Sequence, residues 1–194
     1  MKDHGFKNMT NAELWHEFRV ASKPKLVFGH IYDRISPAVY TYCLKILASE
    51  DAAKDALQET CIKLYEARKN YDEMANLTGF AVRIARNICL NEKAKKSYSD
   101  TNLEDVEIVH HDSPYHRKQL SDILNLAIEE LPEEFKEPLV LKEYMSMSYK
   151  EISEFLDVPL ATVRIRIFRA KTKLKKNLKP YIDEIESIDF LANR

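Results

Sequence analysis

The sequence has few of the residues that most non-helical folds depend on. Only three of its 194 residues are glycine, whereas β-rich folds and nucleotide-binding loops use glycine at turns and phosphate contacts. The three cysteines are widely spaced and form no CxxC pair, which argues against a disulfide framework and fits a reducing compartment. No apolar run approaches the roughly 20 residues that span a bilayer, and residues 1–10 lack the apolar segment of a signal peptide. The sequence therefore predicts a helical, cytoplasmic protein without membrane insertion.

Side chains that would indicate catalysis are also lacking. We find no nucleophile and base at a suggestive spacing and no glycine-rich phosphate loop. His110, His111 and His116 do not have the spacing of a metal site with further ligands. We therefore expect no catalytic residue, no metal and no cofactor, and we do not expect an enzyme.

Charge is sorted along the chain, although the formal net charge is only −1. Residues 160–179 contain eight Lys and Arg and no acid, whereas residues 97–116 contain five acids and no Lys or Arg. Such sorting indicates partners of different charge for different parts of the chain.

Helical periodicity predicts an all-α protein of two small domains. Apolar residues recur at helical spacing over residues 11–21, 24–35, 37–47, 51–69, 79–96, 117–131, 133–143, 148–156 and 160–178. Pro37 is expected to open the third of these helices. We place the domains at residues 10–96 and 118–179, joined by a flexible acidic linker at 97–117. A tail at 180–194 is expected to form a short helix or to fray.

The clearest local motif is a helix-turn-helix in the second half. Ser148 and Glu151 have the spacing of a capping box, so a helix is expected to begin there. Asp157 and Pro159 lie in a three-residue turn, in which Asp tolerates left-handed backbone. A short helix, a tight turn and a longer basic helix are typical of this DNA-binding motif.

The basic helix of this motif has one apolar side and one side suited to DNA. At about 100° per residue, the predicted buried side consists of Val163, Ile167, Ala170 and Leu174. The first turns of such a helix read base edges, and basic residues further along hold phosphates. We expect base reading by Thr162, Ile165 and Arg166, and phosphate contact by Arg164, Arg169, Lys171 and Lys173. An ordinary surface helix with a solvated basic side is the alternative.

The helix expected at residues 51–69 has an unusual polar side. Opposite its apolar residues lie Asp55, Gln58, Glu59, Ile62 and Glu66. An isoleucine within an acidic stripe suits a partner that offers basic groups around an apolar spot. A single exposed isoleucine is also common on protein surfaces, so both interpretations stay open.

The helix expected at residues 79–96 has a side that suits unpaired DNA. Its predicted buried side consists of Ala81, Val82, Ala85, Ile88 and Cys89, and Phe80, Arg83, Asn87 and Asn91 line the other. An aromatic ring beside a cation and two amides can stack on an unpaired base, hold its phosphate and bond its edges. Phe80 as an ordinary core residue is the alternative.

Both halves contain segments that resemble one protein family. The segment DALQETCIKLY, starting at Asp55, resembles the region 2 helix with which sigma-70 family sigma factors grip the β′ clamp helices of RNA polymerase. FAVRIARN, starting at Phe80, is similar to the segment that engages and melts the −10 promoter element. Residues 124–178 resemble region 4, which reads the −35 element. Two such regions joined only by a linker are typical of the extracytoplasmic-function (ECF) group.

The resemblance implies a function for the residues at these positions. It implies a sigma factor that binds core RNA polymerase through its β′ clamp helices and β flap, and that directs promoter recognition, melting and initiation. An anti-sigma factor is a further partner implied by the group. The polymerase contacts would be Asp55, Gln58, Glu59 and Ile62. The −10 contacts would be Tyr71, Asp72 and Asn76, from a loop at residues 70–77 that takes up a flipped base, with Phe80, Arg83, Arg86, Asn87 and Asn91. An ordinary surface loop is the alternative.

The chain departs from the family at Phe80, where tryptophan is usual, so strand opening is expected to be weaker or to depend more on the loop. Two other functions stay open. One is a helix-turn-helix regulator that binds duplex DNA without polymerase. The other is a helical adaptor that binds only proteins, against which the basic helix argues.

Overall fold

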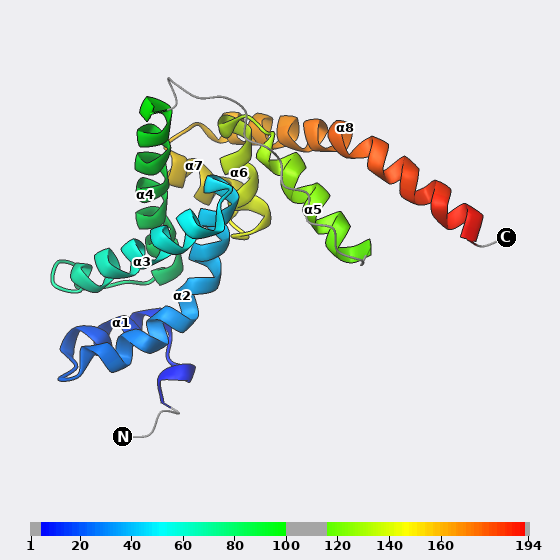
Figure 1. The fold of residues 1–194 in the computed structure, drawn as a ribbon. Coiled ribbons are helices and arrows are strands. Elements are labelled where there is room, and N and C mark those ends of the chain that lie inside the picture. The colour runs from blue at the N-terminus through cyan, green and yellow to red at the C-terminus, as the bar shows by residue number, and fades with distance from the viewer. Residues whose placement is uncertain (1–4, 100–115, 193–194) are drawn as a thin grey trace. The chain divides into compact units, whose positions relative to one another are not determined.

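The computed structural model describes residues 5–99 and 116–192, and every regular element within these ranges is a helix. The chain divides into two compact units, Met1–Leu103 and Glu104–Arg194 (Figure 1). The first unit contains a 3-10 turn (Phe6–Asn8), α1 (Asn11–Val20), α2 (Pro24–Leu47), α3 (Glu50–Ala67) and α4 (Leu77–Ser99). The second contains α5 (His116–Glu129), α6 (Glu133–Glu143), α7 (Tyr149–Leu156) and α8 (Leu160–Ala192). The prediction of an all-α, two-domain fold is confirmed.

The first unit is built around α2, which packs against α1, α3 and α4. Large apolar side chains from all four helices are fully buried there, among them Trp15, Phe18, Ile31, Ile35, Tyr42, Leu64 and Leu77. Cys43 and Cys89 are buried in this core and form no disulfide. Burial of this apolar surface is the main stabilising contribution to the unit.

Local capping fixes where α1 and α3 begin. The Thr10 hydroxyl accepts a hydrogen bond from the Glu13 N–H (3.2 Å), and the Glu13 carboxylate accepts one from the Thr10 N–H (2.7 Å), completing a capping box. The Thr10 N–H holds the pKa of the Glu13 carboxyl below its ordinary value. At α3, the Ser49 hydroxyl accepts from the Ala52 N–H (3.3 Å) and caps the helix.

The expected break at Pro37 is wrong, because α2 runs without interruption from Pro24 to Leu47. A proline inside a helix removes one backbone hydrogen bond and costs about 3 kcal/mol. Here Ile31, Ile35 and Val39, on either side of Pro37, are all fully buried. Tertiary burial along both halves of α2 therefore offsets the local penalty.

The second unit contains the predicted helix-turn-helix, with α5, α6 and α7 packed on α8. Ser148 and Glu151 form the expected capping box at the start of α7. Asp157 ends α7 in the left-handed region (φ 55°), as expected for an Asp in this turn. The Ser153 hydroxyl then donates to the Val158 carbonyl (2.6 Å) and fixes the turn before α8.

Helix α8 is longer than the sequence suggests and continues through Pro180 to Ala192. Residues 181–192 contain neither a glycine nor a second proline, so only one backbone hydrogen bond is lost at Pro180. The predicted linker has helical ends, because α4 reaches Ser99 and α5 begins at His116. Its interior, residues 100–115, lies outside the described residues, as do His110 and His111. No helix in the described part of the chain could cross a membrane.

Candidate nucleic-acid and protein interfaces

Four residues of α3 form an exposed ridge, which we call the α3 ridge: Asp55, Gln58, Glu59 and Ile62. The Ile62 side chain, at the C-terminal end of the ridge, is 59% exposed. The opposite side of α3 is buried, and its one buried hydroxyl, that of Thr60, donates to the Ala56 carbonyl (2.7 Å). Because all four residues of the α3 ridge are exposed, the ridge stays available to a partner.

The charge of the α3 ridge is only weakly engaged within the protein. Glu59 pairs with Lys63 one turn along (3.2 Å), and both side chains are about half exposed. Exposed pairs of this kind contribute roughly 0–1 kcal/mol, so a partner's cation can replace Lys63 at little cost. A shallow groove between α3 and α4 lies next to Glu59 and is lined also by Asn91 and Lys95. The groove therefore brings the ridge next to the far end of the polar side of α4.

Helix α4 has the two sides that its sequence predicts. Ala81, Val82, Ala85, Ile88 and Cys89 are all buried. On the polar side, Arg83, Asn87 and Asn91 are exposed, whereas Phe80 and Arg86 are half-buried. The Phe80 ring lies edge-on to the ring of Tyr71, with 4.9 Å between centroids. Phe80 is thus part of a partly exposed aromatic pair with Tyr71, which is 46% exposed, rather than a core residue.

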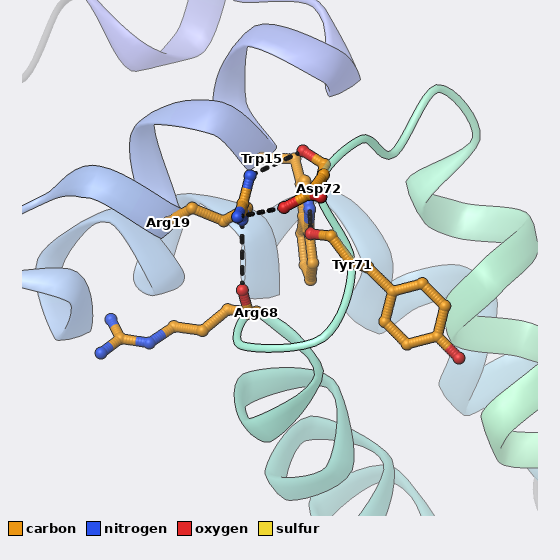
Figure 2. A network of polar contacts seen from close by, with 5 residues as sticks. All are labelled: Trp15, Arg19, Arg68, Tyr71 and Asp72. Atoms are coloured by element: carbon orange, nitrogen blue, oxygen red, sulfur yellow. Dashed lines mark hydrogen bonds and ion pairs between the residues drawn. The ribbon is translucent and has the colours of Figure 1, made fainter.

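Two residues of the loop before α4 have partners inside the protein. The Asn76 side-chain oxygen accepts a hydrogen bond from the Gly79 N–H (2.8 Å) and so caps α4. A Cβ on Gly79 would lie 2.6 Å from the Asn76 amide nitrogen, so the absence of a side chain at Gly79 makes room for the cap. The Asp72 carboxylate forms an ion pair with Arg19 (Figure 2). Among the described contacts of the three loop residues expected at the −10 element, only the Tyr71 side chain forms neither a hydrogen bond nor an ion pair; its ring contacts Phe80.

Sequence reasoning did not identify the two residues that hold this loop in place. Trp15, from α1, donates its indole N–H to the Tyr71 carbonyl (3.0 Å). Arg19, one turn later, donates to the carbonyls of Arg68 (3.2 Å) and Asp72 (3.0 Å), as Figure 2 shows. These partners are 49 to 56 residues apart in sequence, so no local pattern could have indicated the contacts.

The basic helix α8 also has the predicted sides. Val163, Ile167 and Ala170 are buried, and Leu174 is half-buried. The predicted base readers lie on the outer side, where Ile165 is 50% exposed and Thr162 and Arg166 are half-buried. The predicted phosphate contacts Arg164, Arg169, Lys171 and Lys173 are all exposed.

Carboxylates of α6 pair with two of these basic residues. The Lys171 ammonium lies 2.8 Å from Glu143, and this hydrogen bond raises the pKa of Lys171. The Arg166 guanidinium lies 3.9 Å from Glu134. Sequence reasoning missed both acids, and it missed Phe168, which is 71% exposed next to Ile165 on the outer side. An exposed ring beside cations at this place suits contact with a thymine methyl group.

No group of three His, Cys, Asp or Glu side chains within the described ranges is placed to hold a metal ion. The two surfaces, one on α3 and α4 and one on α8, consist of charged and hydrogen-bonding side chains with exposed apolar groups among them. Both offer what a macromolecular partner needs: polar groups around an apolar centre.

The chain is similar to known proteins along both units. The model of Sigma-70 region 2 matches residues 31–98, and that of Sigma-70, region 4, matches residues 121–174. The RNA polymerase sigma-H factor of Pseudomonas aeruginosa is 28% identical over 86% of this chain and 93% of its own length. The ECF RNA polymerase sigma factor SigW of Bacillus subtilis is 27% identical over 78% of this chain and 89% of its own.

Among solved structures, the sigma factor RpoE of Bartonella quintana, determined with the anti-sigma factor NepR, has a TM-score of 0.66. Its sequence is 22% identical, and the match covers 78% of this chain and 96% of the RpoE chain, which shows a shared fold. The two matched regions together take in α3, α4 and the helix-turn-helix, the elements that carry both surfaces described above. The chain therefore belongs to the sigma-70 family of RNA polymerase sigma factors, in its ECF group.

Proposed function

We propose that this sigma factor binds core RNA polymerase through the α3 ridge and directs promoter recognition, DNA melting and initiation in the cytoplasm. The observation that carries the proposal is the presence, in one chain, of an exposed Ile62 within an acidic ridge and a helix-turn-helix with a basic outer side. We assign residues 10–96 to core binding and the −10 element, and residues 118–179 to the −35 element.

The α3 ridge fits a helical partner with a basic surface. The 59% exposed Ile62 offers an apolar spot, and Gln58 and Glu59 offer acceptors within one turn of it. Acceptors around a small apolar centre are the arrangement that specific interfaces use, because the centre contributes affinity and the rim contributes orientation. The β′ clamp helices of polymerase are the partner that the family suggests.

The Tyr71–Phe80 pair and the polar side of α4 fit an unpaired promoter strand. Holding a base outside the duplex costs a few kcal/mol, and stacking on an aromatic ring recovers about 1–3 kcal/mol per base. Arg83 and Asn87 are exposed along the same side of α4, so a phosphate and a base edge can be held beside the rings. We propose that Arg86, Asn91, Asp72 and Asn76 border this site.

The outer side of α8 fits the major groove of the −35 element. Thr162, Ile165 and Arg166 lie in its first two turns, from which a recognition helix reads base edges. Arg164, Arg169 and Lys173 are exposed and suit phosphate contacts. Lys171 can do so after leaving Glu143.

A regulator that covers these surfaces is part of the proposal. Two structural neighbours were determined with proteins bound, the sigma factor RpoE with an anti-sigma factor and CnrH with the cytosolic domain of CnrY. We propose that a protein of the anti-sigma class holds this chain inactive by occupying the same surfaces.

The test is transcription in vitro with core RNA polymerase and genomic DNA fragments. We expect defined transcripts only when the protein is added, and co-migration of the protein with core enzyme. Gln58→Ala combined with Glu59→Lys should abolish both. Asp33→Lys, an exposed charge reversal on α2, is the control and should leave both intact. A free-standing regulator would instead bind duplex DNA alone and ignore core enzyme, which would overturn the proposal.

A further inference from the structure

The loop that carries Tyr71 is held from outside by helix α1. Figure 2 shows Trp15 and Arg19, from α1, reaching the loop that connects α3 to α4. The model of Sigma-70 region 2 begins at residue 31, so α1 precedes the matched segment. A helix outside the matched region thus makes the contacts that fix a loop inside it.

Arg19 makes three contacts with the loop at once. Its Nε donates to the Arg68 carbonyl (3.2 Å) and its Nη1 to the Asp72 carbonyl (3.0 Å), and its Nη2 pairs with the Asp72 carboxylate. A planar guanidinium can do this because its donors point in fixed directions within one plane. The contacts fix the loop both before and after Tyr71.

Trp15 fixes Tyr71, which lies between the two residues that Arg19 holds. Its ring is fully buried and its indole N–H donates to the carbonyl of Tyr71 itself (3.0 Å). The Arg68 side chain adds a further anchor to the core, because its guanidinium lies over the rings of Phe18 (5.6 Å) and Tyr65 (5.5 Å). The backbone on both sides of Tyr71 is therefore tied to a rigid core.

The fixed backbone determines where the Tyr71 ring lies. The ring is 46% exposed and meets Phe80 edge-on, with 4.9 Å between centroids and 63° between planes. Asn76 caps α4 at the other end of the loop, so Phe80 is fixed as well. Ordering a loop on binding reduces affinity, whereas a loop that is ordered beforehand avoids this loss.

We propose that Trp15 and Arg19 are positioning residues for strand separation. They hold the Tyr71–Phe80 pair as a preformed platform on which an unpaired base of the promoter stacks. The proposal rests on the proposed function, because it assumes that this pair meets the −10 element. It adds a role for α1, in which Trp15 and Arg19 act through the loop that they hold.

The test uses two conservative substitutions in the full-length protein bound to core RNA polymerase. Arg19→Lys keeps the charge but cannot make three coplanar contacts, and Trp15→Phe keeps an aromatic ring but loses the N–H donor. The control is Arg34→Lys. Arg34 contacts Asn11 (3.0 Å) and the Phe6 carbonyl (3.5 Å) near the start of α1 and does not touch the loop.

Two affinities and one rate are compared. They are the affinity for core enzyme, the affinity of the holoenzyme for the single non-template strand of a promoter found by transcription in vitro, and the rate of open-complex formation. We expect Arg19→Lys and Trp15→Phe to weaken single-strand binding about tenfold, the effect of losing roughly 1.4 kcal/mol, and to slow opening. Core affinity and the Arg34→Lys control should stay unchanged.

Each other outcome counts against the proposal. Unchanged single-strand binding by Arg19→Lys would overturn it. Unchanged binding by Phe80→Ala would overturn it as well, because the Tyr71–Phe80 pair would then not be the platform. A parallel loss of core affinity and thermal stability in Arg19→Lys would show a structural role only, and so overturn it too. If the wild-type protein neither binds core enzyme nor supports transcription, the proposed function fails first and this inference falls with it.

Discussion

The exposed isoleucine of the α3 ridge allows a quantitative test of core binding. Complete burial of an isoleucine side chain contributes about 1.5–3 kcal/mol. Ile62 is 59% exposed in the free protein, so a partner that covers the rest gains about 1–2 kcal/mol. Replacing Ile62 by alanine should therefore weaken core binding roughly 5- to 30-fold.

The same substitution should leave the fold intact or stabilise it slightly. Alanine has a higher helix propensity than isoleucine, by a few tenths of a kcal/mol, and little packing is lost because Ile62 is mostly exposed. A matched control exists on α2, where Leu26 is 57% exposed. Leu26→Ala removes a similar exposed surface away from the ridge and should not change core affinity.

The assay is displacement of labelled wild-type protein from core RNA polymerase by each unlabelled variant, with thermal unfolding measured in parallel. The reasoning is refuted if Ile62→Ala competes as well as the wild type. It is equally refuted if Leu26→Ala loses as much affinity, since exposed apolar area in general, and not the α3 ridge, would then govern binding.

Three further predictions concern the promoter surfaces and the fold. Phe80→Ala should reduce open-complex formation by an amount equivalent to about 1–3 kcal/mol, measured by permanganate footprinting, and leave closed-complex binding nearly unchanged, measured by gel shift. Lys173→Ala should lower the slope of log affinity against log salt by about 0.9, one phosphate contact; Lys171→Ala should lower it less, because Glu143 already pairs with that ammonium. Hydrogen bonding to the Ser148 N–H lowers the pKa of Glu151 in the folded state. The cap therefore stabilises the helix-turn-helix above the ordinary pKa of a glutamate and is lost as pH falls below it. Glu151→Gln should flatten that part of the melting profile.

Each of these predictions has a result that contradicts it. Equal losses of closed and open complexes with Phe80→Ala would mean that the ring supports the fold of α4 instead of a flipped base. Identical salt slopes for the two lysine variants would show that Glu143 does not compete with phosphate. An unchanged acid profile for Glu151→Gln would place the acid sensitivity of the unit elsewhere.

Features determined by neighbouring residues could be predicted from the sequence. Ser148 and Glu151 are three residues apart, so their capping box is visible in the sequence and α7 begins where expected. Asp157 adopts the left-handed backbone that its side chain tolerates. The buried and exposed sides of α3, α4 and α8 follow from helical spacing alone, and the structure has them as predicted.

Features determined by residues far apart in the sequence could not be predicted from it. Pro37 indicates a break by every local rule, yet burial of the flanking turns keeps α2 continuous. The contacts of Arg19 with the loop, and of Glu143 with Lys171, join residues of different elements whose spacing in sequence carries no signal. The roles of the site residues stay predictions. Their chemistry and exposure suit contact with DNA and polymerase, and the experiments above test that contact.

The acids of α6 have a consequence for how the free protein finds its sites. Glu143 lies 2.8 Å from Lys171, and Glu134 lies 3.9 Å from Arg166. A DNA phosphate that binds Lys171 or Arg166 must first displace a carboxylate that is already in place, which reduces the charge-driven attraction that arbitrary duplex would exert. A cognate sequence compensates with contacts to its bases, and the rest of the chromosome does not. An equal loss of charge-driven affinity leaves the ratio of cognate to non-cognate affinity unchanged, but it lowers the number of molecules that are sequestered on the wrong DNA.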